Sequence, residues 1–227
     1  MTYEAVIFDF NGVLLWDAPL HEKAWQVAAH KLRGSELSED EFLYHVHGRP
    51  NAHILSYILG RQVQGEELLG LIDFKESMYR DLCIESPEVF ALSPGAVSLF
   101  DQLAQHQIPF TIATASEITN LNFFIKTLGL DAWFDTDLII YDDGVIAGKP
   151  APDMYALAAH KLGCEAERCI VVEDAVSGFR SAQAAGIGYI IGLGPLAQHS
   201  RIQACEEVSC VIESLEQFPI NLLRQKA

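Results

Sequence analysis

The chain has 227 residues, half of them hydrophobic, and a formal net charge of −16 from 31 acidic and 15 basic residues. Such an excess of negative charge repels nucleic acid and anionic membrane surfaces, so we expect neither as a partner. The length and the apolar content suit one α/β domain, or one such domain with an insertion.

The first predicted element is a short buried strand at residues 5–8, which ends in Asp9. Gly12 follows closely and allows the chain to turn sharply at little steric cost. In an open α/β sheet, reactive groups lie just outside the carboxyl ends of the strands. Asp9 therefore occupies the position of a nucleophile or a metal ligand, although an acid that only stabilises a turn has the same signature.

A helical stretch without convincing strand signals runs from about Pro19 to Cys83. Its expected helices cover residues 20–29, a segment opened by a capping box at residues 38–41, residues 51–59 and residues 66–83. Four helices inserted after the first strand predict a separate helical cap domain. We place this cap at residues 16–90 and the core at residues 1–15 and 91–227.

Strands and helices then alternate to the end of the chain. The expected strands are residues 110–113, 138–140, 169–172, 189–191 and 210–212, and the expected helices are residues 96–106, 120–128, 152–162, 177–185, 198–206 and 214–223. This alternation predicts an α/β fold with a parallel, doubly wound, Rossmann-like sheet. The Asp142-Asp143-Gly144 segment is expected to be the turn of a small hairpin before Gly148.

Polar side chains follow four of these strands or their turns: Asp9, Thr114, Lys149 and the pair Glu173-Asp174. In one parallel sheet they converge on one crevice, and together they suggest phosphoryl transfer. A carboxylate attacks phosphorus, while a cationic and a hydroxyl side chain bind the equatorial oxygens. Carboxylate ligands combined with a substrate phosphate favour Mg²⁺ over zinc as the cofactor.

Each of these signals also has a purely structural interpretation. Thr114 could bond to its own backbone, and Lys149 could be a solvated loop lysine. Glu173-Asp174 precede a helix and could simply complement its dipole. A single site explains all of the signals at once, whereas the structural interpretations require four separate coincidences.

The motifs resemble those of the haloacid dehalogenase superfamily. The matching stretches are FDFNGVL at residues 8–14, IATAS at 112–116, GKPAPD at 148–153 and VEDAVSG at 172–178. The resemblance covers nearly the whole chain and implies a Rossmann-like core with a four-helix cap. It further implies Asp9 as an aspartyl-phosphate nucleophile and Lys149 as a catalytic cation. Mg²⁺ would be held by Asp9, the backbone carbonyl of Asn11 and Asp174, with Glu173 close by.

Other segments resemble the branch that contains β-phosphoglucomutase and small sugar-phosphate phosphatases. They are residues 21–25 (HEKAW) and the pair Gly48-Arg49. By this resemblance Arg49 reaches from the cap to the substrate. Gly12, His21, Thr114 and Ala115 complete the implied substrate- and phosphate-binding set.

Two residues depart from the family pattern. Family phosphatases and mutases usually carry an Asp two residues after the nucleophile as general acid and base, whereas this chain has Asn11. Either Asn11 lowers turnover or a neighbour replaces the acid, and His21 and Asp17 are the candidates. Mutase-type members tend to have a lysine after Ser116, whereas this chain has Glu117, which opposes a second substrate phosphate.

The favoured function is hydrolysis of a small phosphate ester, with sugar phosphates as the expected class. A β-phosphoglucomutase-like mutase, a phosphate-binding protein with weak turnover, and carbon–halogen cleavage are the alternatives. No signal peptide or transmembrane-length run is visible, so a cytoplasmic location is expected. A monomer is favoured over an oligomer. The five cysteines favour reduced, buried thiols over the zinc site that the equal spacing of Cys164–Cys169 and Cys205–Cys210 allows.

Overall fold

The computed structural model describes residues 2–46 and 49–224, and the chain divides into two compact units. The core unit comprises Met1–Trp16 and Ala91–Ala227, and the cap unit comprises Asp17–Phe90. The sequence pattern assigns Trp16 to the cap, whereas in the structure Trp16 lies with the core. We describe each unit by itself.

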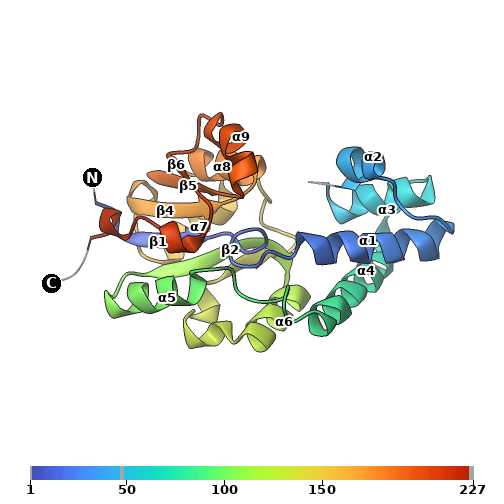
Figure 1. Cartoon of the computed structure of the whole chain (residues 1–227), viewed down its shortest axis with the longest axis horizontal. Coiled ribbons are helices and arrows are strands. Elements are labelled where there is room, and N and C mark those ends of the chain that lie inside the picture. The colour runs from blue at the N-terminus through green and yellow to red at the C-terminus, as the bar shows by residue number, and fades with distance from the viewer. Residues whose placement is uncertain (1, 47–48, 225–227) are drawn as a thin grey trace. The chain divides into compact units, whose positions relative to one another are not determined.

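The core unit contains a six-stranded parallel sheet in the order β3-β2-β1-β4-β5-β6 (Figure 1). The strands are β1 (Ala5–Phe8), β2 (Phe110–Glu117), β3 (Ile140–Asp142), β4 (Cys169–Glu173), β5 (Tyr189–Leu193) and β6 (Cys210–Ile212). The order runs outward from β1 in both directions, as in a doubly wound fold. The predicted fold class is therefore confirmed.

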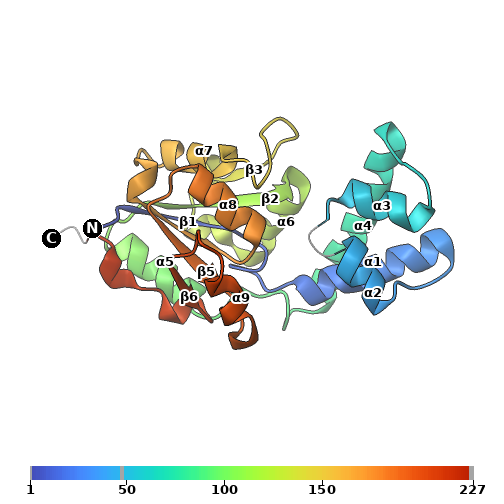
Figure 2. The same ribbon diagram turned by 90° about the horizontal axis from the view of Figure 1, so that it is seen from above.

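Helices cover both faces of this sheet, because β1 alternates its side chains between two apolar layers. Ile7 faces α7 (Asp153–Lys161) and α8 (Val176–Ala184), while Phe8 packs edge-on against Phe100 of α5 (Ala96–Gln105), with ring centroids 5.7 Å apart. Figure 2 shows α7 and α8 on one side of the sheet and α5 on the other. The remaining core helices are α6 (Ile118–Leu128) and α9 (His199–Gln203).

The predicted helix at residues 198–206 is shorter, at His199–Gln203, and four other predicted elements of the core differ more strongly in the structure. Strand β2 continues through Thr114 to Glu117, with an irregularity in its pairing to β3, and β3 begins two residues later than expected. Residues 143–149 form no strand, so the predicted hairpin is wrong. Asp142 and Asp143 instead accept hydrogen bonds from backbone N–H groups of residues 144–146. The predicted last helix is two short 3₁₀ turns, Leu215–Gln217 and Ile220–Leu222, because Pro219 interrupts it.

The cap unit is helical, as predicted. Its helices are α1 (Ala18–Arg33), α2 (Glu39–Glu41), α3 (Asn51–Leu59) and α4 (Gly65–Glu85), with a π-helical turn at Phe42–Val46. The capping box at Ser38 and Glu41 is present. An apolar cluster that includes Trp25, Leu55 and Ile58 forms the centre of the cap unit, so this unit has a core of its own.

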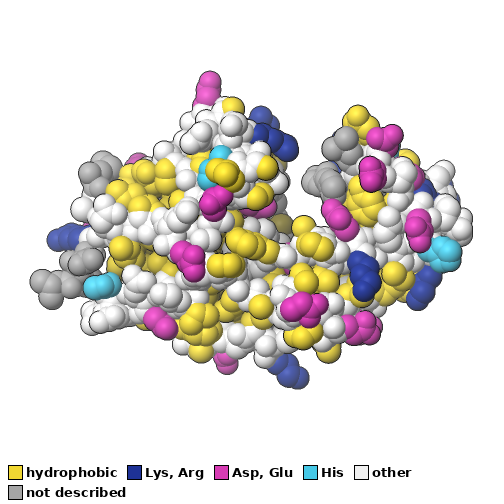
Figure 3. Space-filling view, in the orientation of Figure 1, with side chains coloured by type: hydrophobic (Ala, Val, Ile, Leu, Met, Phe, Trp, Pro, Cys, Tyr) yellow, Lys and Arg dark blue, Asp and Glu magenta, His cyan; other side chains and the backbone are white. Residues whose placement is uncertain are grey.

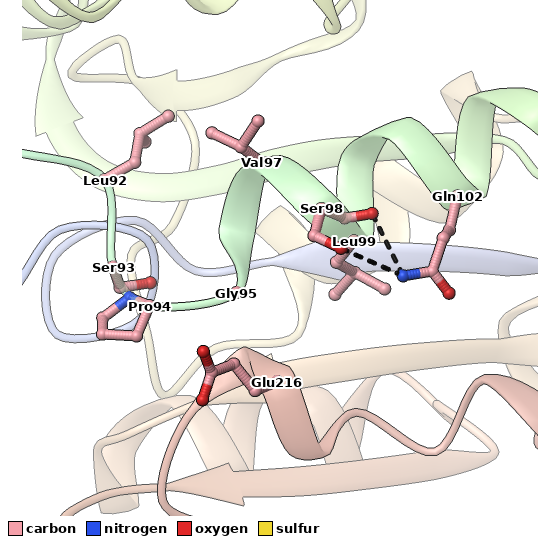
Figure 4. Close-up of a pocket in the computed structure, with 9 residues that line it drawn as sticks. All are labelled: Leu92, Ser93, Pro94, Gly95, Val97, Ser98, Leu99, Gln102 and Glu216. Atoms are coloured by element: carbon pink, nitrogen blue, oxygen red, sulfur yellow. Dashed lines mark hydrogen bonds between the residues drawn. The ribbon is translucent and has the colours of Figure 1, made fainter.

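Acidic side chains are dispersed over the face of the core unit that Figure 3 presents, and the basic side chains there form no continuous patch. Within the described residues, no helix is both long and apolar enough to cross a lipid bilayer. A cavity of about 570 Å³ lies at the start of α5, beside Glu216 (Figure 4). Its lining includes none of the predicted site residues, so it is not the predicted site.

Candidate active site

The site begins at the carboxyl end of β1, where pairing places Asp9 between its neighbours. Phe8 is level with Ile112 of β2 and with Val172 of β4, so Asp9 is level with Glu173. The backbone N–H of Asp9 donates to the carbonyl of Val172 at 3.0 Å. Asp9 is buried, with 7% of the residue exposed.

Gly12 closes the turn after β1 with a φ of +89°, which disfavours other residues. A Cβ atom at this position would lie 2.2 Å from the Asp174 Oδ2 atom. The glycine therefore serves the site twice, by allowing the turn and by leaving room for the second acid.

Lys149 links two carboxylates of the site. Its Nζ atom lies 2.5 Å from Asp9 Oδ1 and 2.8 Å from Glu173 Oε2. The loop that carries Lys149 is held to α8, because Ser181 Oγ donates to the carbonyl of Ala151 at 2.5 Å. Lys149 is thus a buried, paired cation and not the solvated loop lysine of the structural interpretation.

Glu173 is almost fully buried, and both of its carboxylate oxygens accept hydrogen bonds. Oε1 accepts from the backbone N–H groups of Asp174 and Ala175, at 3.2 and 3.1 Å. Oε2 accepts from Lys149 and from the hydroxyl of Tyr155, the latter at 2.5 Å. Both oxygens of the Glu173 carboxylate are therefore already hydrogen-bonded to donors of the protein.

Gly178, near the start of α8, makes room for this carboxylate. A Cβ atom at residue 178 would lie 2.0 Å from Glu173 Cδ. We expect Gly178→Ala to destabilise the protein by about 1–3 kcal/mol, because the added methyl overpacks the site. Gly70→Ala is the matched control: Gly70 also lies within a helix, has open space around its Cβ position, and should gain roughly 0.5–1 kcal/mol. Chemical denaturation of both variants measures these changes, and equal effects would contradict the overpacking argument.

Burial and mutual repulsion shift the pKa values of the acids of the site. Burial, reinforced by the charge of Glu173, raises the pKa of Asp9 to about 7, although Lys149 opposes the shift. The pKa of Asp174 is also raised, by burial and by the charges of Glu173 and Asp9. Burial alone would raise the pKa of Glu173, but Lys149 and the hydroxyl of Tyr155 hold it below its usual value. With all three acids ionised, the site would carry more negative charge than its one lysine compensates, and this excess is why the protonated forms of Asp9 and Asp174 are favoured.

A divalent cation fits this excess of charge. Asp9, Glu173 and Asp174 each offer a carboxylate oxygen, and these oxygens lie within 4.8 Å of one another. Carboxylate oxygens at such spacing are ligands that suit Mg²⁺. The contacts of Glu173 make Asp9 and Asp174 the better candidates for direct ligands. Mg²⁺ itself remains a prediction.

Thr114 lies in the second half of β2, and Asn11 lies in the turn that follows β1 and Asp9. Thr114 Oγ1 accepts a hydrogen bond from the backbone N–H of Ser116 at 3.1 Å, which leaves its own O–H as a donor. Ser116 Oγ donates to Asn11 Oδ1 at 2.9 Å and so fixes the orientation of the Asn11 amide. Ala115, between them, is exposed, and Glu117 ends the strand.

The predicted substitutes for the missing acid belong to the cap unit. His21 Nδ1 lies 2.8 Å from Lys75 Nζ, and His21 Nε2 lies 3.3 Å from Asp17 Oδ2. Because an ammonium group only donates, Nδ1 accepts and the Nε2–H faces Asp17. Asp17 is buried and also accepts a hydrogen bond from Tyr79. Both ring nitrogens of His21 are thus engaged, and proton transfer by His21 would require one contact to break.

Arg49 is exposed at the start of the segment before α3, and its backbone N–H donates to Val46. Gly48, the other residue of the predicted Gly48-Arg49 pair, lies outside the described residues. The role of Arg49 in substrate binding stays a prediction.

Sequence reasoning missed two residues of the site, Tyr155 and Gly178. Tyr155 is part of the apolar pattern of α7, and nothing local indicates that its hydroxyl reaches an acid 18 positions away. Gly178 belongs to a quoted motif, but its close approach to Glu173 depends on how α8 packs on β4.

Comparison with known proteins places the chain in a family. Residues 3–186 match the family model of haloacid dehalogenase-like hydrolases. Hexitol phosphatase A of Escherichia coli (strain K12) is 30% identical over 223 residues, which cover 97% of this chain and 95% of that protein. A phosphorylated carbohydrates phosphatase of Thermotoga maritima is 29% identical over 194 residues, covering 84% of this chain and 85% of that protein.

The fold agrees with a solved structure as well. A crystal structure described as a HAD hydrolase, family IA, variant 3, from Entamoeba histolytica superimposes with a TM-score of 0.91 at 39% identity and covers 96% of both chains. The resemblance drawn from the four motifs is thereby confirmed. The chain belongs to the haloacid dehalogenase-like hydrolase family and is an enzyme of that family.

Proposed function

We propose that this enzyme is a Mg²⁺-dependent phosphoric monoester hydrolase that acts on a small phosphorylated carbohydrate through an aspartyl-phosphate intermediate. The observation that carries the proposal is the contact of Lys149 with both Asp9 and Glu173, beside a third acid, Asp174. A carboxylate, a buried cation and an acidic pair at one sheet edge combine the groups that phosphoryl transfer requires.

In the proposed reaction, the carboxylate of Asp9 forms a new bond to phosphorus while the bond to the ester oxygen breaks, and that oxygen leaves as an alkoxide that takes a proton from water. Water then cleaves the aspartyl phosphate and restores Asp9. Lys149 and the hydroxyl of Thr114 donate to the equatorial oxygens of the transferring group, and the backbone N–H of Ala115, the residue after Thr114, is a further donor. Asp9, Asp174 and the carbonyl of Asn11 would hold Mg²⁺, which supplies positive charge that offsets the repulsion between carboxylate and phosphate.

The names of the relatives support the substrate class. One relative is named a hexitol phosphatase and another a phosphatase of phosphorylated carbohydrates. Glu117 favours a substrate with one phosphate over a bisphosphate, because a carboxylate three residues from Thr114 repels a second anionic group. This argues against a mutase.

One observation favours a second candidate, a phosphate-binding protein with slow turnover. Asn11 cannot donate a proton to the leaving alcohol, and Ser116 holds its amide in place. A screen against a panel of alkyl and aryl phosphate esters, with and without Mg²⁺, distinguishes the two. Turnover of at least one ester that depends on Mg²⁺ supports the hydrolase, whereas binding of phosphate without turnover supports the second candidate.

Mg²⁺ should raise the stability of the protein as well as its activity. A ligand that binds only the folded state stabilises it by about 2.7 kcal/mol at 100 times its dissociation constant. We expect calorimetry to show binding at millimolar Mg²⁺ and thermal unfolding to shift upward. Asp174→Asn is the comparison, since it removes one charge of the acidic group and should weaken binding. Absence of binding to the parent protein would exclude Mg²⁺ at this site.

A further inference from the structure

Tyr155 is the third residue of α7 and lies fully buried in the apolar layer that covers β1 and β4. A tyrosine in such a layer normally finds a hydrogen-bond partner for its hydroxyl. Here the partner is Glu173 Oε2, at 2.5 Å. The side chain therefore joins the hydrophobic core of the unit to the charged edge of the sheet.

The ring of Tyr155 makes a second contact with the same group of charges. Lys149 Nζ lies 4.7 Å from the ring centroid, within the range of a cation–π interaction. Tyr155 thus contacts Lys149 directly through its ring, and indirectly through the carboxylate that its hydroxyl holds. The ring contact and the hydrogen bond to Glu173 together restrict where the ammonium group of Lys149 can lie.

The three N–H donors of Lys149 show why this restriction matters. One donates to Asp9 Oδ1 and one to Glu173 Oε2. Among the described residues, the third has no acceptor and remains for a substrate oxygen. The direction of the third donor is fixed once the other two and the ring contact are fixed, because the ammonium group is tetrahedral.

We infer that Tyr155 is a positioning residue that directs the ammonium group of Lys149 toward the phosphoryl group. The inference rests on the proposed function in taking Lys149 as a ligand of phosphate. Without the hydroxyl, Glu173 Oε2 keeps Lys149 as its remaining side-chain donor, and the ammonium moves toward Glu173. Without the ring, the ammonium group also loses its cation–π contact with the aromatic face of Tyr155.

A double-mutant cycle tests this inference, with inorganic phosphate as the probe in the presence of Mg²⁺. Tyr155→Phe keeps the ring and removes the hydroxyl, and Lys149→Gln keeps a donor and removes the charge. We expect Tyr155→Phe to weaken phosphate binding about tenfold in the parent protein and less than twofold in the Lys149→Gln background. Equal weakening in both backgrounds, or none in either, would overturn the inference, as would a parent protein that does not bind phosphate.

Tyr3→Phe is the matched control, because Tyr3 is a buried tyrosine of the same unit whose hydroxyl donates to the carbonyl of Gly188. It should leave phosphate affinity unchanged. Should Lys149→Gln fail to fold, a crystal structure of Tyr155→Phe decides the question. We expect Nζ displaced from Asp9 Oδ1, and an unmoved Nζ would contradict the inference.

Turnover is measured separately in the same proteins. If the parent protein binds phosphate but hydrolyses no ester, the proposed function fails while the cycle still tests Tyr155. If the parent protein hydrolyses esters and the cycle shows no coupling, the proposed function stands and the role of Tyr155 fails.

Discussion

Replacement of Asp9 by Asn should abolish turnover of phosphate esters, by about 10⁴–10⁶-fold, while the protein keeps its fold. An amide is a poor nucleophile and cannot form the proposed aspartyl phosphate. The amide oxygen can still accept the hydrogen bond that Asp9 Oδ1 now accepts from Lys149. Steady-state kinetics on the preferred ester, together with circular dichroism, measures the result. A folded variant with the parent rate would exclude Asp9 as the nucleophile.

The pH dependence of stability provides an independent check on Asp9. Burial raises the pKa of this carboxyl from 3.8 to about 7. Between these pH values Asp9 is therefore ionised in the unfolded chain and still largely protonated in the folded protein. The unfolded state then binds fewer protons, and stability falls as pH rises through this range. We expect the metal-free parent protein to lose stability between about pH 4 and pH 7 more steeply than Asp9→Asn. Identical profiles would show that Asp9 ionises normally in the fold.

Replacement of Asn11 by Asp should raise turnover of alkyl phosphate esters by about 10²–10⁴-fold, the usual contribution of a positioned general acid. An alkoxide is a poor leaving group and requires a proton as the P–O bond breaks. The substitution nearly preserves shape, and Ser116 Oγ can donate to a carboxylate at residue 11 as it now donates to Asn11 Oδ1. The gain should be much smaller for aryl phosphates, whose leaving groups need less assistance.

The parent protein should also show the kinetic signature of a missing base. Because no carboxylate at residue 11 activates the attacking water, the aspartyl phosphate should accumulate, and a burst should precede a slow steady state with aryl phosphates. If His21 or Asp17 supplies the proton instead, His21→Ala or Asp17→Ala lowers alkyl-ester turnover and Asn11→Asp changes little. If none of the three substitutions changes alkyl-ester turnover, the hypothesis of a displaced or missing general acid is wrong.

The order of the elements followed from local pattern. Runs of three or four mainly apolar residues between helical periods predicted the inner strands β1, β4 and β5, since parallel strands buried on both faces are continuously apolar. The predictions failed where pairing partners or chain geometry decide the outcome. Strand β2 extends past Ala113 because β3 pairs with it through an irregularity, and Pro219 broke the predicted last helix.

The sequence by itself determined that Asp9 and Glu173-Asp174 lie at strand ends and that Lys149 lies in the segment after β3, because short motifs carry that information locally. Only the tertiary structure decided how these groups meet. The contact between Lys149 and Asp9 spans 140 positions, and the hydroxyl of Tyr155 reaches Glu173 because α7 packs against β1, β2 and α8. Periodicity specifies which face of an element is buried, whereas the contacts within that buried layer depend on strand register and helix packing. For this reason Asp9 was predictable from the sequence and the role of Tyr155 was not.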